Sequence, residues 1–464
     1  MAIGGYSQIS SMIRSTTIAM SAAAGLAFLA GCRTIAPAPE RAARDHLAAV
    51  GRELPPAQAQ LAVLGTVSQP ADYVRFALLK HPAVFAAYSE WRAAVESIAP
   101  ARALPDPQIT FQADIAKTVT SLMPGVMFDL MVPGKRAAMA REATAASEVA
   151  CREYVGTVVR TAADVRRAWI ELAFVEEAIR LREASLTALR QSGDIAAAEY
   201  STGRGMTTLE GQIRTAGEAD RIRSEIATFA DHLHAARVQF KSALGLAPED
   251  ADPFWPRFLL APTIIPSEDE LWQRVQSANT ELAKMRAMVE MAVAGEEVAR
   301  QSRVPDFTAG LMTDVKQVPW MWRPTATVTL PVWRGKIAGQ INAARARREA
   351  AAANVDAERL TMAAELARML YMVREADRMI AYIDNTALPN IDRTVASAEA
   401  SIQSGMSSPG MIPEARFMAS NMRVERLNAL RDRELAVTGL LQMTAEVATG
   451  AGSLLPDTVL SINP

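Results

Sequence analysis

The residues that could bind a metal or activate a nucleophile are few and poorly spaced. His232 and His234 lie two apart on an expected helix, so their side chains point to different faces and cannot chelate one zinc ion. The Gly-Lys pairs that end at Lys135 and Lys336 lack the earlier glycine of a phosphate-binding loop, and we interpret them as turns where a strand passes into a helix. No Ser-His-Asp order, Gly-rich dinucleotide loop or Cys-rich motif occurs, so we expect no enzyme, no cofactor and no resident metal.

A cysteine near the start of the chain carries the clearest chemical signal. Before Cys32 stand a basic residue and an apolar run over 18–30, which is too short to span a bilayer but fits a secretory signal peptide. The tetrapeptide LAGC that ends at Cys32 resembles a bacterial lipobox, whose cysteine is acylated. We expect a signal peptide over 1–31, starting at Met1 or Met12, and lipid such as palmitate on Cys32. The alternative is a plain signal peptide followed by a chance cysteine.

The bulk composition excludes several classes of protein. Half of the 464 residues are apolar, 22% are charged and the net charge is −2, so nothing indicates nucleic acid as a partner. Cys151 is the second of only two cysteines, which excludes a disulfide framework. Aromatic residues make up 6%, while Ala and Met supply much of the apolar content. This composition suits long, closely packed helices.

The chain repeats itself at a spacing of about 200 residues. Pro-Asp at Asp106 recurs at Asp306, and Gly-Lys at Lys135 recurs at Lys336. Each copy reads as helix, Pro-Asp, strand, loop, strand, Gly-Lys, very long helix, Gly-containing turn and helix, which indicates duplication of a whole structural half. We expect an N-terminal linker over 32–66, a first repeat over 67–247, a proline-rich linker over 248–266, a second repeat over 267–448 and a C-terminal tail over 449–464.

Four segments alternate between apolar and polar residues, and they predict strands over 107–115, 123–132, 307–315 and 324–332. Apolar positions such as Phe111 and Leu130 share a face that we expect to contact lipid. Taken alone, this pattern also fits two soluble hairpins.

The polar positions of the same strands define the opposite face. Asp114, Asp129 and Asp314 fall on it, so we expect them to line a lumen, as solvated carboxylates or with a mild preference for cations. Three tryptophans near the strand ends suit an interfacial aromatic belt: Trp320, Trp322 and Trp333.

The number of strands predicts an oligomer. Four strands cannot close a barrel, and open sheet edges are not tolerated in hydrocarbon. Three chains would pool about twelve strands, which lies within the size range of bacterial barrels.

The helices are too long for a compact domain. No proline occurs between Lys135 and Pro248, and apolar residues recur at three-four steps as in a coiled coil. The stretch 136–200 alone would extend roughly 95–100 Å. A matching stretch over 337–402 contains Pro389, where we expect a kink. The fold class we predict is mainly α, with long helical hairpins and a small β part.

In their order and duplication these features resemble the TolC family of outer-membrane efflux proteins. The stretch from His81 through Trp91 to Asp106 resembles the family's first helix and its entry to the barrel, and 278–306 resembles the same passage in the second half. The resemblance covers nearly all of the chain after the signal peptide. It implies a coiled-coil α-barrel in the periplasm joined to a trimeric β-barrel of about twelve strands in the outer membrane.

The same resemblance assigns roles to the two turns between long helices, expected near 200–208 and 403–413. There each glycine is followed by an acid and an arginine, as at the family's periplasmic tips, where an adaptor docks: Gly203, Glu210, Arg214, Gly405, Glu414 and Arg416. Pro409 and Pro413 depart from the helix formers usual in the family, so the second turn is expected to be longer or stiffer.

For function, the resemblance implies a lipid-anchored, passive trimeric duct in the outer membrane. It would work in a tripartite system with a periplasmic adaptor and an inner-membrane pump, of RND type, and would export drugs or metal ions. Five of the 22 methionines lie near the strands: Met123, Met127, Met131, Met312 and Met321. Thioethers can bind Cu(I), although we favour the interpretation that these side chains fill gaps.

A second hypothesis is a lipid-anchored periplasmic coiled-coil protein with a structural or adaptor role. An adaptor would be expected to carry a Gly-rich lipoyl-like β-domain beside one hairpin. The sequence instead predicts two hairpins and no such domain.

Overall fold

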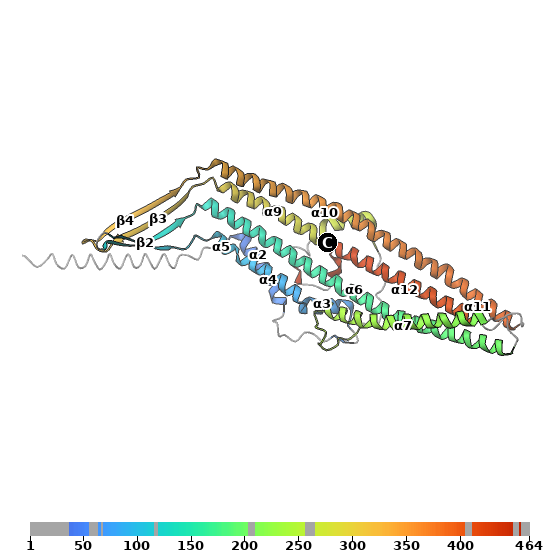
Figure 1. Cartoon of the computed structure of the whole chain (residues 1–464). Helices are drawn as coiled ribbons and strands as arrows, with labels where there is room; N and C mark the ends of the chain where they lie inside the picture. Colours follow the sequence, from blue (N-terminus) through green and yellow to red (C-terminus); the bar gives the residue numbers. More distant parts are fainter. Residues whose placement is uncertain are drawn as a thin grey trace, which may run out of the picture.

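The chain is drawn out along one axis, with a β-sheet at one end and two helical hairpins at the other (Figure 1). This computed structural model describes residues 37–54, 64–65, 68–115, 119–202, 209–255, 265–403, 411–448 and 454–455. The predicted fold class is confirmed, because long helices carry four antiparallel strands.

The sheet has the order β1-β2-β3-β4, and all neighbours are antiparallel. Its strands are β1 (Gln108–Ile115), β2 (Val119–Leu130), β3 (Asp306–Asp314) and β4 (Met321–Thr329). β2 begins at Val119 rather than at residue 123, and β4 at Met321 rather than at residue 324. Both hairpins are therefore tighter than predicted, since the strand pairing includes Val119–Leu122 and Met321–Arg323, which were expected in the loops.

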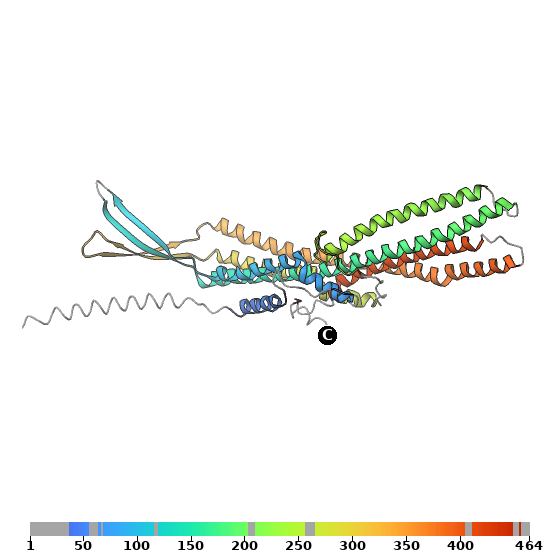
Figure 2. The same cartoon turned by 90° about the horizontal axis from the view of Figure 1, so that it is seen from below.

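Very long helices leave the sheet and return in pairs. The first pair is α6 (Pro133–Thr202) and α7 (Leu209–Ala243); the second is α10 (Arg334–Tyr382), α11 (Leu388–Gln403) and α12 (Met411–Met443). With 70 residues, α6 extends about 105 Å at 1.5 Å per residue. The two hairpins lie side by side at the end far from the sheet (Figure 2).

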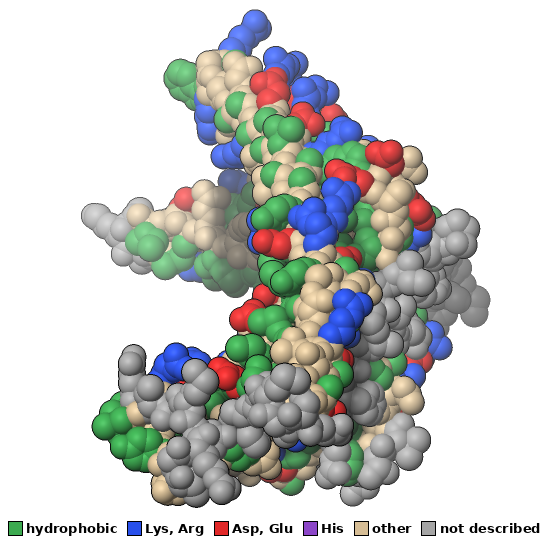
Figure 3. Space-filling view, turned by 90° about the vertical axis from the view of Figure 1, so that its right-hand side faces the viewer, with side chains coloured by type: hydrophobic (Ala, Val, Ile, Leu, Met, Phe, Trp, Pro, Cys, Tyr) green, Lys and Arg blue, Asp and Glu red, His purple; other side chains and the backbone are tan. Residues whose placement is uncertain are grey.

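Together the helices form a wall. α6 packs on α7, α9 and α12, and α10 packs on α9 and α12, so α6 is central and α10 lies at one edge. Two shorter helices complete the wall: α8 (Glu268–Ala278), which packs on α10 and α12, and α9 (Thr280–Gln301), which packs on α6 and α10. Seen along the long axis, the wall is curved and hollowed on one side (Figure 3).

The predicted kink near Pro389 takes a definite form. A π-helical turn, η1, spans Ile383–Ala387 between α10 and α11, directly before the proline. Proline cannot donate a backbone hydrogen bond, and a wider turn accommodates the missing donor.

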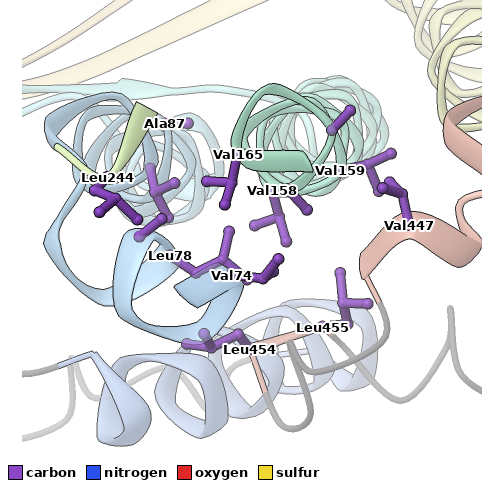
Figure 4. Packing of buried hydrophobic residues seen from close by; sticks show 14 of the residues in the cluster. Val74, Leu78, Ala87, Val158, Val159, Val165, Leu244, Val447, Leu454 and Leu455 are labelled. Carbon is purple, nitrogen blue, oxygen red and sulfur yellow. The ribbon is translucent and has the colours of Figure 1, made fainter. Parts of the chain in front are cut away.

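The largest hydrophobic core lies midway along the molecule, where short helices pack on α6 (Figure 4). The ring of Tyr73 meets Trp169 edge-on at 4.9 Å, and Trp91 stacks on Tyr154 at 5.6 Å. The short elements here are α2 (Ala38–Glu53), α3 (Pro70–Lys80), α4 (Pro82–Glu96), α5 (Ile98–Arg102) and the 3-10 turn η2 (Glu446–Ala448). In the part of the chain that the structure describes, no helix has the length and apolar character to span a membrane.

Candidate functional site

One face of the sheet is apolar and exposed across all four strands. The register places Ile109 opposite Val126, Val126 opposite Leu311, and Phe307 opposite Val328. Each of the following large side chains on this face is more than a third exposed: Ile109, Phe111, Leu122, Val126, Phe128, Leu130, Phe307, Leu311 and Val328. A patch of this extent is unfavourable in water and marks a surface that contacts lipid or protein.

The opposite face is polar, and two of its methionine side chains are buried. Met123 and Met312 are 1% and 8% exposed. A Cβ on Gly125 would lie 2.5 Å from the Met312 side chain, so only glycine fits beside it. For these two methionines the structure shows a packing role.

The three strand carboxylates differ in their surroundings. Asp114 is exposed and Asp129 is half-buried, so both are accessible on the polar face, and their place in a lumen stays a prediction. Asp314 is buried instead, and it accepts hydrogen bonds from Ser121 Oγ at 2.8 Å and from the Lys316 amide at 3.0 Å. The expectation of a solvated carboxylate is therefore corrected for Asp314, which fixes the end of the β3–β4 hairpin.

The tryptophans lie at both ends of the second strand pair. Trp320 and Trp322, at the β3–β4 turn, are 61% and 57% exposed, and Trp333, directly before α10, is 75% exposed. Two exposed aromatic groups separated by a strand length fit the two interfaces of a bilayer.

The strand-to-helix junction holds an ion pair that the sequence interpretation missed. Lys135 Nζ lies 2.8 Å from both carboxylate oxygens of Asp306. The Gly-Lys pair is thus a turn and also an anchor between the two repeats. The joint recurrence of Pro-Asp and Gly-Lys was the signal that could have revealed it.

Buried acids, also missed from the sequence, hold the helical wall together. Glu296 on α9 contacts Arg300 at 2.7 Å and Arg348 of α10 at 2.9 Å. Glu434 on α12 contacts Arg166 of α6 at 3.2 Å and is 3% exposed. Only the i,i+4 spacing of Glu296 and Arg300 was visible in the sequence.

The predicted tip residues are described in part. Gly203 and Gly405 lie outside the described residues, as does Cys32, and Glu210 lies in the first turn of α7 with a side chain that is not described. Three tip residues are exposed at the start of the returning helices, in keeping with a docking surface: Arg214, Glu414 and Arg416. Their roles stay predictions.

Buried contacts below the tips join the two hairpins. Ser185 Oγ and Ser420 Oγ lie 2.6 Å apart between α6 and α12. Arg182 contacts Glu225 of α7 at 2.9 Å and Asn421 of α12 at 2.8 Å. Among the described residues, no cluster of His, Cys, Asp and Glu is arranged to hold a metal ion.

Known proteins share this arrangement. The profile of the family described as outer membrane efflux protein matches residues 271–446, which hold most of the second repeat. The channel OprN aligns with a TM-score of 0.69 at 14% identity, over 88% of this chain and 96% of that one. CusC aligns with a TM-score of 0.67 at 16% identity, over 84% of this chain and 95% of that one. VceC of Vibrio cholerae aligns with a TM-score of 0.65 at 16% identity, over 81% of this chain and 96% of that one. The sequence matches no curated protein.

These comparisons confirm the resemblance stated from the sequence. The chain has the fold of outer-membrane efflux channels along nearly the full length of those proteins, and its residues 271–446 match the outer membrane efflux protein family.

Proposed function

We propose that this protein is the outer-membrane channel of a tripartite efflux system, a passive duct built from three copies of the chain. The observation that carries the proposal is the sheet. Its outer face is apolar and exposed, its inner face carries the carboxylates, and both of its edge strands, β1 and β4, have no further partner among the described strands.

The geometry explains why three copies are needed. An open sheet edge is not tolerated in hydrocarbon, and three sheets of four strands give a closed barrel of about twelve. The hollowed wall of helices would close in the same way into a tube (Figure 3). With α6 extending about 105 Å from the membrane, the tube crosses much of the periplasm.

Partners and cargo follow from the same architecture. The hairpin ends, with Arg214, Glu414 and Arg416 exposed, are where a periplasmic adaptor would dock. An inner-membrane pump, of RND type, would supply the energy for export. The cargo would be small molecules, drugs or metal ions, and acylation at Cys32 would anchor the mature chain.

The alternative of a periplasmic coiled-coil protein with soluble hairpins is less favourable. It would leave Phe111, at 74% exposed, and its neighbours on the sheet in water.

Outer-membrane fractionation and bilayer conductance test the proposal. The purified protein should come from the outer-membrane fraction and should give discrete conductance steps in a planar bilayer. Palmitate labelling that is lost in Cys32→Ser would support the anchor. A protein that is released by salt and gives no conductance would overturn the proposed function.

A further inference from the structure

The strand hairpins of the two repeats pair in the same register, with residue numbers that differ by 200. Within the first hairpin Ile109 lies opposite Val126. Within the second, Ala309 lies opposite Ala326, which is the same pair moved by 200 residues in both strands. The pairing of β2 with β3 inside the chain therefore predicts, by the same shift of 200 residues, how β4 would pair with β1 of a second copy.

Inside the chain, the strands of the two repeats pair through the β2–β3 ladder. It places Met127 opposite Gly310 and Phe128 opposite Ala309, and the same register continues where the Val315 amide donates to the Leu122 carbonyl at 3.0 Å. Leu122 and Val315 are thus a hydrogen-bonded pair. In an antiparallel ladder such pairs alternate with pairs that have no hydrogen bond and whose Cα atoms are only about 4.5 Å apart. Met127 and Gly310, five positions further along, are a pair without hydrogen bonds.

Shifting this ladder by 200 residues places β4 against β1 of a second copy. Thr327 then lies opposite Thr110 and Val328 opposite Ile109, so polar meets polar and apolar meets apolar. Further along, Arg323 lies directly opposite Asp114, on the lumen face.

The charges agree with this register. Arg323 and Asp114 are exposed, and neither lies within ion-pair distance of an opposite charge among the described residues. Within the chain Arg323 interacts electrostatically with Asp314, whose carboxylate is already bound by Ser121. Opposite charges directly across a strand pair are stabilising, whereas a shift by two residues would place Arg323 against an uncharged side chain.

The strand-to-helix junctions give a second, independent match. Inside the chain Lys135 pairs with Asp306 at 2.8 Å. The equivalents on the outer edges, Lys336 and Asp106, are both exposed and make no ion pair among the described residues.

From these observations we infer that β4 pairs with β1 of a second copy in the register that sets Arg323 against Asp114 and brings Lys336 to Asp106. The inference rests on the proposed trimer and specifies which residues of the second copy complete it.

Paired cysteines test the register in the full-length protein. Thr327→Cys with Thr110→Cys should form disulfide-linked dimers and trimers on mild oxidation, because this is a pair without hydrogen bonds and with close Cα atoms. Thr327→Cys with Gln112→Cys is the matched control, since that diagonal spacing of about 7–8 Å is too long for a disulfide. Unsubstituted protein, which contains Cys151, should give no linked species.

The outcomes separate the two proposals. Linking in the matched pair alone supports the register. If the protein runs as a trimer on an unheated gel but the control pair links, or neither pair links, the register is wrong and the proposed function still stands. An unsubstituted protein that is monomeric overturns both.

Charge reversal gives a readout without cysteine. Arg323→Asp should lower the temperature at which the trimer dissociates on a gel, and adding Asp114→Arg should restore most of the loss. A double variant no more stable than the single one contradicts the pairing.

Discussion

The sheet and the midsection use similar apolar residues in opposite ways. In the midsection Trp169 and Trp91 are each 2% exposed, enclosed by helices of the same chain. In the sheet Phe111 and Ile109 are 74% and 73% exposed. One region is complete within a single chain, whereas the other would gain lipid on its face and further strands at its edges in the proposed trimer. The difference shows which part of the fold a single chain can stabilise and which part depends on assembly.

The charged groups divide in the same way. Glu434 finds Arg166 and Arg433 inside the chain. Arg323 and Asp114, on the two edge strands of the sheet, are exposed and have no opposite charge at ion-pair distance among the described residues, and Arg323 interacts only at longer range with Asp314.

The largest effect is expected from opening the midsection core. Trp169→Ala removes a large side chain that contacts Tyr73 and Phe240, and it should lower the free energy of unfolding by about 3–5 kcal/mol. Thermal unfolding followed by circular dichroism in detergent measures the loss. Phe85→Ala, at a 56% exposed position of α4, is the control and should change little. Equal losses for both variants would remove the contrast between core and surface.

Charges on the apolar sheet face should act on assembly instead. Phe111→Arg or Leu130→Arg should cost about 2–4 kcal/mol in membrane insertion, because arginine would enter hydrocarbon. The yield of heat-resistant trimer in outer membranes measures this cost. Gln112→Arg, on the polar face of β1, should be tolerated. Unchanged yield for both apolar-face variants would contradict the assignment of the faces.

Loss of a buried acid in the helical wall should have a smaller effect. Glu296→Gln leaves Arg300 and Arg348 without their carboxylate, but both are partly exposed, so we expect about 1–3 kcal/mol. Chemical unfolding in detergent would measure it, with Glu297→Gln as the neighbouring control. A loss no larger than that of the control would show that the α9–α10 contact does not depend on this charge.

The junction ion pair should contribute least to stability. Lys135 and Asp306 are 22% and 49% exposed, so Lys135→Gln should cost less than about 1 kcal/mol. The same unfolding measurement tests this value. A loss above that of Glu296→Gln would show that the junction ion pair contributes more to stability than the buried acid of the helical wall.

The reactivity of Cys151 tests whether the midsection core stays closed in the folded protein. Its side chain is 6% exposed, and burial raises the pKa of the thiol to about 12, so it should stay protonated and resist maleimide at neutral pH. Mass spectrometry should show labelling only after unfolding. Rapid labelling of the folded protein would show that the core opens.

Much of this architecture follows from sequence patterns. Strand alternation around Phe111 and the three-four spacing along α6 depend on local periodicity, so strand number, helix length and the duplication were all predictable. The burial of Asp314 was not, because Ser121 approaches it from a strand 193 residues away. The contacts of Glu296 with α10 depend likewise on packing between distant helices, which periodicity does not encode.

Native mass spectrometry of the detergent-extracted protein most directly tests whether one chain supplies a third of a closed tube. We expect a single species of three chains that does not exchange subunits without denaturation. A stable monomer, or an assembly of two or four chains, would contradict the closure of the sheet and of the helical wall by three copies.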